Sequence, residues 1–438
     1  MGARHHSGQA LVVVLAFTAA MLGGFVLVFN SGQSVNEKAR MVNAADAAAY
    51  SAALWEARAL NFQSYMNRAI VANEVAIAQF VTLRSWSRYM EQNIRNVSVV
   101  TAWIPGIREA LQALDKLWTG IDRVLQRTSP VAETALSHWN VNALAFAQVL
   151  AHQQAPITAG EIASEVARAN RPDADLSTGA RMFALVNGTH WLNSITAKYR
   201  HGESELARFK DVVMRSRDGF TAQRNWNPVS LGVVGARKRG GTDLIGEYSW
   251  RGMDTLAAHV DLGVTRQEIP LAWNAAENRH HPQTGRGVHG GSFRTNPRTS
   301  RLAQRTFVPA SGYLGLPEIR DIDQPALQKD LRLRYVVELR EAAEHIATAD
   351  RALPQVAIAL PDGRAIDPAP HWQQDSMFAV SAAEIYFRRP VERADGRREF
   401  PSLFNPYWQV HLASVEGADR ALAAPTKGLA VDPYAVLP

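Results

Sequence analysis

The chain has 438 residues, of which 47% are hydrophobic and 20% charged, proportions typical of a folded protein that exclude wholesale disorder. The absence of cysteine excludes disulfides, thiolate metal sites and cysteine nucleophiles together. A net charge of +6 favours solubility and loose attraction to anionic surfaces, and it decides nothing about the fold.

The first element is an uncharged apolar run, Ala10–Phe29. Twenty helical residues span about the hydrocarbon core of a bilayer. We therefore predict a cytoplasmic leader over residues 1–9 and a transmembrane helix over 10–29. A signal peptide that is later removed is the alternative, although no A-x-A-like cleavage site follows the run. Ala16, Ala20 and Gly24 recur every four residues, which predicts a face that packs closely against another membrane helix.

An alanine-rich helix follows the membrane run. From Met41 to Leu83 apolar residues recur at three- and four-residue spacing, and a second apolar set widens the stripe. Burial in a helical bundle is therefore favoured over a bare two-stranded coil. The small residues Ala45, Ala48 and Ala52 predict close helix contact near the membrane, and we expect them to join the chain to partners.

Here the residues resemble a known family. Gly8 and Gln9, the apolar helix and the phrase NAADAAAYSAA at Asn43–Ala53 are similar to the N-terminal region of TadE-like and TadG-like proteins of the Tad/Flp pilus-assembly system. The following phrase, ALNFQSYMNRAIVANEVAIAQ, resembles the usual continuation, so the resemblance covers residues 1–85.

The resemblance implies a pilin-like anchor that crosses the inner membrane once, with the large C-terminal part in the periplasm or outside the cell. It implies pilin-like or other membrane-anchored pilus-assembly partners, and a homo-oligomer is compatible with it. It also points to Gly8 and Gln9 as a processing site, although Val13 stands where processed pilins carry Glu. Longer relatives carry a von Willebrand A domain, but Asp175–Gly179 (DLSTG) ends its metal motif in Gly, so no metal site is transferred.

Helical character continues to about residue 218. Breaks are expected at Pro105-Gly106 and Ser129-Pro130, with Pro130 in a first helical turn, and Ala180–Arg217 is expected to be helical. We therefore predict a mainly helical stalk and bundle over residues 30–218. Beyond it, short alternating runs such as Leu331–Leu339 predict strands, and the region 219–438 is expected to be an antiparallel α+β domain with long loops. The fold class is α+β.

A basic segment, Asn278–Phe307, is the most unusual loop. Its three histidines match no metal-ligand spacing, and no nucleic-acid-binding fold surrounds it. We expect contact with an acidic partner or lipid headgroups through its six arginines: Arg279, Arg286, Arg294, Arg298, Arg301 and Arg305.

No catalytic motif was found. The chain lacks G-x-S-x-G, P-loop and H-E-x-x-H patterns, and GRGVHG follows no strand. Glu341 and His345 are expected as a surface pair on a helix, and the carboxylates of Asp321 and Asp323 as loop residues with ordinary pKa values. The sequence thus predicts a membrane-anchored structural protein without catalytic residues, metal or cofactor, and without a nucleic-acid partner. An extracytoplasmic enzyme or binding module with its site in residues 219–438 is the alternative.

Overall fold

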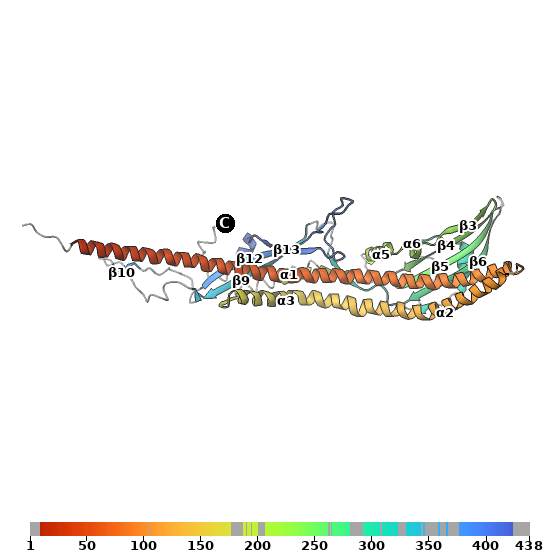
Figure 1. Ribbon diagram of the computed structural model, residues 1–438, viewed down its shortest axis with the longest axis horizontal. Coiled ribbons are helices and arrows are strands. Elements are labelled where there is room, and N and C mark those ends of the chain that lie inside the picture. Colours follow the sequence, from red (N-terminus) through yellow and green to blue (C-terminus); the bar gives the residue numbers. More distant parts are fainter. Residues whose placement is uncertain are drawn as a thin grey trace, which may run out of the picture.

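The protein is a long rod built on one helix, α1 (Gln9–Val100), of 92 residues. At 1.5 Å per residue this helix is about 138 Å long. Figure 1 shows it running from the N-terminus to the far end of the molecule. The computed structural model describes the following residues: 9–104, 106–176, 187–189, 191–193, 195–199, 206–261, 263, 265–280, 292–306, 309–322, 330–342, 345–346, 358–359, 365–366 and 376–423.

Three helical segments run back along α1 from its far end: α2 (Ile107–Trp139), a π-helical turn η1 (Asn140–Ala145) and α3 (Phe146–Asn170). The reversal ends at Gly106, whose φ of 80° favours glycine. The N–H of Gly106 donates a hydrogen bond to Glu109 Oε2 at 2.7 Å, which satisfies a donor at the start of α2.

The strands form two main sheets on the side of α1. A proximal sheet, nearer the N-terminus, has the antiparallel order β1-β9-β12-β13, and a distal sheet has the order β3-β4-β5-β6-β7, with only β6 and β7 parallel. Strands β2 and β8, and β10 and β11, form two-stranded pairs. The strand bounds are β1 Ala174–Leu176, β2 Ile195–Tyr199, β3 Trp226–Leu231, β4 Val234–Ile245, β5 Ser249–Asp261, β6 Arg266–Arg279, β7 Ala310–Ser311, β8 Ile319–Ile322, β9 Arg332–Ala342, β10 Ile358–Ala359, β11 Ala365–Ile366, β12 Ser376–Phe387 and β13 Trp408–Ala413. The remaining helices are α5 (Leu206–Arg215), α6 (Gly219–Ala222), α7 (Pro297–Thr306) and α8 (Gly417–Ala423).

The proximal core is built from alanines. On α3, alanines recur at every fourth residue (Ala155, Ala159, Ala163, Ala167), and they pack in one cluster with the alanines of α1 between Ala44 and Ala57 and with side chains of β9 and β12. Small side chains allow the two helix backbones to approach closely, so α3 and the proximal sheet enclose this part of α1.

The distal core brings a sheet backbone against α1. A Cβ added at Gly252 of β5 would lie 3.2 Å from the carbonyl oxygen of Val81, so only glycine fits there without a shift. Around this approach Ile70, Ile77 and Val81 of α1 pack with Trp250 and other buried apolar residues.

The α+β fold class and the long apolar N-terminal helix are confirmed. Three local predictions are wrong. Part of Ala180–Arg217 is strand β2, which pairs with β8; Pro130 lies inside α2 rather than in a first turn; and Glu341 lies in strand β9, not on a helix. The boundary at residue 219 stays a prediction, and β1 and β2 from before it pair with β9 and β8 from after it.

Candidate functional site

Among the described residues, little protein covers the apolar N-terminal part of α1. Its large side chains are exposed on all sides of the helix, with Leu11 66%, Phe17 66% and Val28 72% exposed. A helix that is apolar all round is stable in a membrane and not in water. This is the one helix among the described residues that is long and apolar enough to cross a membrane.

The predicted helix-packing residues divide into two groups. Ala16, Ala20 and Gly24 are exposed, and nothing lies within 4 Å of a Cβ built at Gly24. Ala45, Ala48 and Ala52 are 0% exposed because they form the proximal core with α3 and the sheet. For these three, the expected contact with a partner is corrected: the close packing exists, but it is made within the chain. Of the predicted processing site, Gly8 lies outside the described residues, and Gln9 is the first residue of α1.

An arginine at the end of α3 joins three elements. Nη1 of Arg171 lies 2.5 Å from Glu37 Oε2 on α1, and its Nε donates to Glu341 Oε2 of β9 at 2.7 Å. Burial of Arg171 opposes its charge, but hydrogen bonds to Glu341 and Glu37 raise its pKa. Glu341 was predicted to pair with His345, but its partner is Arg171. His345 lies 3.9 Å from Asp173 instead.

Polar side chains fill the space between α1, the returning helices and the distal sheet. Glu74 accepts hydrogen bonds from Asn140 (2.9 Å), Trp250 (2.9 Å) and Tyr313 (2.8 Å), which belong to η1, β5 and the segment before β8. Burial raises the pKa of Glu74 to about 7, although these three donors favour the carboxylate. Similarly, Asn67 accepts from Gln148 Nε2 at 2.6 Å. These contacts fix how α1, the returning helices and the strands are aligned along one another.

A charged cluster is buried beside this layer. Asp254 accepts from Arg224 Nε at 2.7 Å and from Lys238 Nζ at 2.6 Å, and the side chains of all three are 0% exposed. Burial would raise the pKa of Asp254, but Arg224 and Lys238 hold it below its ordinary value. The Lys238 ammonium lies 4.7 Å from the ring centroid of Tyr89. Because the Ser85 hydroxyl of α1 also donates to Asp254 Oδ2 at 2.7 Å, the cluster holds the distal sheet to α1.

The prediction of ordinary pKa values for the loop carboxylates is wrong for Asp321. This residue lies in β8, where burial raises the pKa of its carboxyl against hydrogen bonds donated by the Leu403 and Ile322 amides and the Tyr199 hydroxyl. Asp323 lies outside the described residues.

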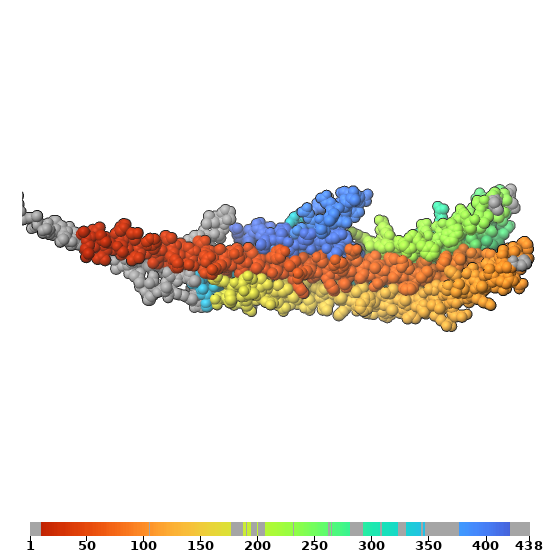
Figure 2. All heavy atoms as spheres, viewed as in Figure 1, coloured from red at the N-terminus to blue at the C-terminus, as the bar shows by residue number. Residues whose placement is uncertain are grey.

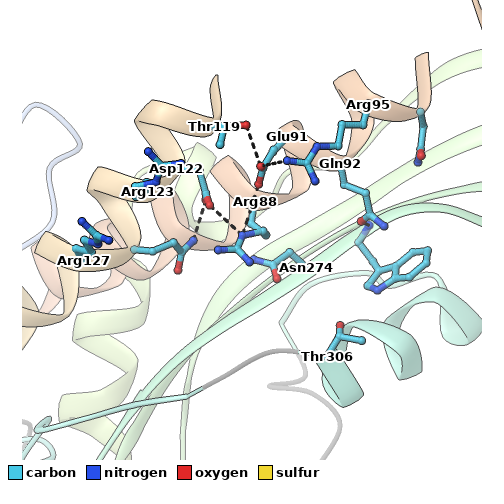
Figure 3. A pocket seen from close by; sticks show the side chains of 13 residues that line it. Arg88, Glu91, Gln92, Arg95, Thr119, Asp122, Arg123, Arg127, Asn274 and Thr306 are labelled. Atoms are coloured by element: carbon cyan, nitrogen blue, oxygen red, sulfur yellow. Dashed lines mark hydrogen bonds and ion pairs between the residues drawn. The ribbon is translucent and has the colours of Figure 1, made fainter. Parts of the chain in front are cut away.

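An open cavity of about 650 Å³ lies at the far end of the rod, where α1, α2, β6 and α7 meet. Figure 3 shows its acids already engaged: Glu91 accepts from Arg95 at 2.5 Å and from Thr119 at 3.0 Å, and Asp122 accepts from Arg88 at 2.9 Å. Such paired groups suit polar contact rather than acid–base chemistry. The cavity is lined by Arg88, Glu91, Gln92, Arg95, Asn96, Thr119, Asp122, Arg123, Gln126, Arg127, Trp273, Asn274 and Thr306.

The basic segment contains a helix that the sequence did not suggest. Arg298, Arg301 and Arg305 lie on exposed positions of α7, whose first turn is capped by Glu268: its Oε1 accepts from the Thr299 amide at 2.7 Å. Arg294 is exposed, Arg279 ends β6, and Arg286 lies outside the described residues. The anionic partner of this segment stays a prediction. Within the described ranges, no group of three or more His, Asp and Glu side chains is arranged to hold a metal.

Comparison with known proteins gives one match. Residues 8–57 match the model of the Tad family, the Flp pilus-assembly TadE/G-like proteins. The matched segment contains the whole apolar run and most of the alanine face of the proximal core. The resemblance seen in the N-terminal phrases is thus confirmed over this range. No curated protein and no solved structure matches the chain.

Proposed function

We propose that this chain is a membrane-anchored structural component of Tad/Flp-type pilus assembly or a related envelope machine. The observation that carries the proposal is the position of the family match, residues 8–57, which spans the apolar run and the start of the rod. The similarity therefore covers the part of the chain that joins a membrane to an extended protein body. One helix continues from the run to the far end, so beyond Phe29 it extends the rod by about 107 Å.

In this proposal the apolar helix packs against pilin-like partners within the inner membrane, and the rod lies on its periplasmic or outer side. The exposed face of Ala16, Ala20 and Gly24 supports such contact because small residues let membrane helices approach closely. The buried, mutually paired charges of Arg224, Lys238 and Asp254 support a structural role, since they hold the distal sheet together against α1.

The test replaces Gly24 by leucine in the full-length chain. No atom lies within 4 Å of the position of the new Cβ, so the rod should fold unchanged while the membrane contact is blocked. We expect Gly24→Leu to lose co-purification of pilus-assembly proteins from detergent extracts. The matched control is Leu22→Phe, which adds bulk to the opposite face of the same helix, where Leu22 is also exposed. Unchanged co-purification in Gly24→Leu, or equal loss in both variants, would contradict the proposed contact.

A further inference from the structure

Helix α2 has polar residues on its buried side and large apolar residues on its exposed side. Its buried positions are polar: Asp122, Ser129, Glu133 and Ser137 all face the interior. Large apolar side chains are exposed between charged ones on its outer side, and they follow the three- and four-residue spacing of a coiled-coil seam. We name this set the outer seam: Ile107 (43% exposed), Leu114 (40%), Leu117 (62%), Ile121 (38%), Val124 (59%) and Val131 (69%).

The seam continues past the π-helical turn. That turn adds one residue to the helix, and the exposed positions shift by one with it, to Phe146 (62%), Leu150 (47%) and Ile157 (57%), with Trp139 (58%) at the junction. A regular helix would have rotated these side chains away from the line of the seam. The turn therefore keeps one apolar stripe along the side of α2 and α3 that faces away from α1 and the sheets. Figure 2 shows α2 and α3, in orange and yellow, along the lower edge of the rod, across α1 from the sheets.

The area is too large for a solvent-facing surface. Ten large side chains, each about half exposed, present on the order of 1,000 Å² per chain, more than the largest apolar patch of ordinary monomers. A standard protein interface buries about 800 Å² on each partner. Two copies of the seam would meet that size without any further contact.

We infer that the outer seam is the interface with a second copy of this chain, paired in parallel and in register. A common membrane anchor places both N-termini on the same side, so two rods standing in one membrane run parallel. The seam residues occupy the core positions of a heptad, with Ile107, Leu114 and Ile121 at position a and Leu117, Val124 and Val131 at position d. In a parallel pair each of these residues contacts its own copy, for example Leu117 against Leu117.

The flanks of the seam match this arrangement. In a parallel coiled coil, each residue before an a position contacts the partner residue five places further on. Here that rule pairs a glycine with a leucine twice, Gly106 with Leu111 and Gly120 with Leu125, whereas Trp118, opposite Ala113, packs on Trp86 of its own α1. The next flank pairs Arg127 with Ala132, so no like charges meet.

An antiparallel pair would instead place the large flank of one copy, with Leu111 and Leu125, against the same large flank of the other. A membrane surface fits less well, because the seam lies beside the distal half of α1. The inner side of α2 contacts α1 there: Glu133 pairs with Arg84, which lies about 80 Å beyond Phe29 along the helix.

The experiment uses the absence of cysteine in the chain, which makes any introduced thiol unique. Leu114→Cys, Leu117→Cys, Ile121→Cys and Val124→Cys are made separately in the full-length protein and treated in native membranes with a short bismaleimide. Lys116→Cys is the matched control, because it is exposed on the same helix but lies off the seam. We expect covalent dimers from all four seam variants and none from the control.

A second variant separates pairing from folding. Leu117→Asp combined with Val124→Asp should abolish the dimer formed through Ile121→Cys and leave the far-UV circular dichroism spectrum unchanged, because both side chains face water in the single chain. Dimers from a single seam position only would indicate an antiparallel pair and overturn the inference. Dimers from Lys116→Cys in equal yield, adducts only with other proteins, or no dimers would overturn it as well.

Discussion

The buried carboxyl of Glu56 should make the rod less stable as the pH rises. Glu56 lies on α1 in the proximal core, 3% exposed, and its charge acts on Tyr335 of β9. Its Oε1 has no hydrogen-bond partner among the described residues. Burial raises the pKa of Glu56 from 4.5 to about 8, because the charged form loses its hydration.

The size and sign of the effect follow from this shift. Below pH 4.5 the carboxyl is protonated in both the folded and the unfolded chain, and it costs nothing. Above pH 4.5 the unfolded chain ionises first, so folding stability is lost progressively until the folded carboxyl ionises near pH 8. At 1.36 kcal/mol per pH unit, the loss between pH 5 and pH 7.5 is about 3 kcal/mol.

Glu56→Gln removes the charge and keeps the shape, so the variant should be spared this loss. The free energy of unfolding is measured with urea on the full-length protein in detergent, by tryptophan fluorescence at pH 5 and pH 7.5. We expect the stability difference between the variant and the wild type to grow by about 3 kcal/mol over that range. Glu161→Gln, at an exposed position of α3, is the control and should show no such growth. A difference that is equal at both pH values would refute the argument.

Two further substitutions test the two cores. Ala48→Leu should destabilise the rod by about 1–3 kcal/mol in the same urea assay, because the fully buried methyl group has no room to grow; Ala72→Leu, exposed on the same helix, should be near neutral, and equal stability of the two variants would contradict the alanine packing. Asp254→Asn should cost about 3–5 kcal/mol because it leaves the buried charges of Arg224 and Lys238 without their counter-ion, and a cost below about 1 kcal/mol would show that the cluster does not hold the distal sheet.

The sequence predicted the start of the α1 core well and its continuation poorly. Met41, Ala45, Ala48 and Ala52, the first four members of the predicted stripe, are all 0% exposed. The small residues near the membrane run pack along one face of a single helix. Their spacing in the sequence, at every third or fourth residue, shows that face directly.

Further along, Trp55 and Phe62 were expected inside but are 38% and 42% exposed, while Glu56 and Gln63 beside them are buried. The polar inner face that continues from there depends on partners far away in the chain, as Glu74 depends on Trp250 and Tyr313. No local pattern contains those partners. The same limit applies to α2, whose periodicity was visible although nothing local showed which side of the helix the rest of the chain would cover.

The alanine face of α1 has a consequence for biosynthesis. It is made early, between residues 44 and 57, but strands β12 and β13, which help enclose it, end at residue 413. At about 5–20 residues per second, ribosomes need on the order of 20–70 s to supply them. During that interval α3 is made and can pack against α1, but the side of α1 that will face the proximal sheet is still uncovered. Until the last strands arrive, this apolar face is therefore open to aggregation.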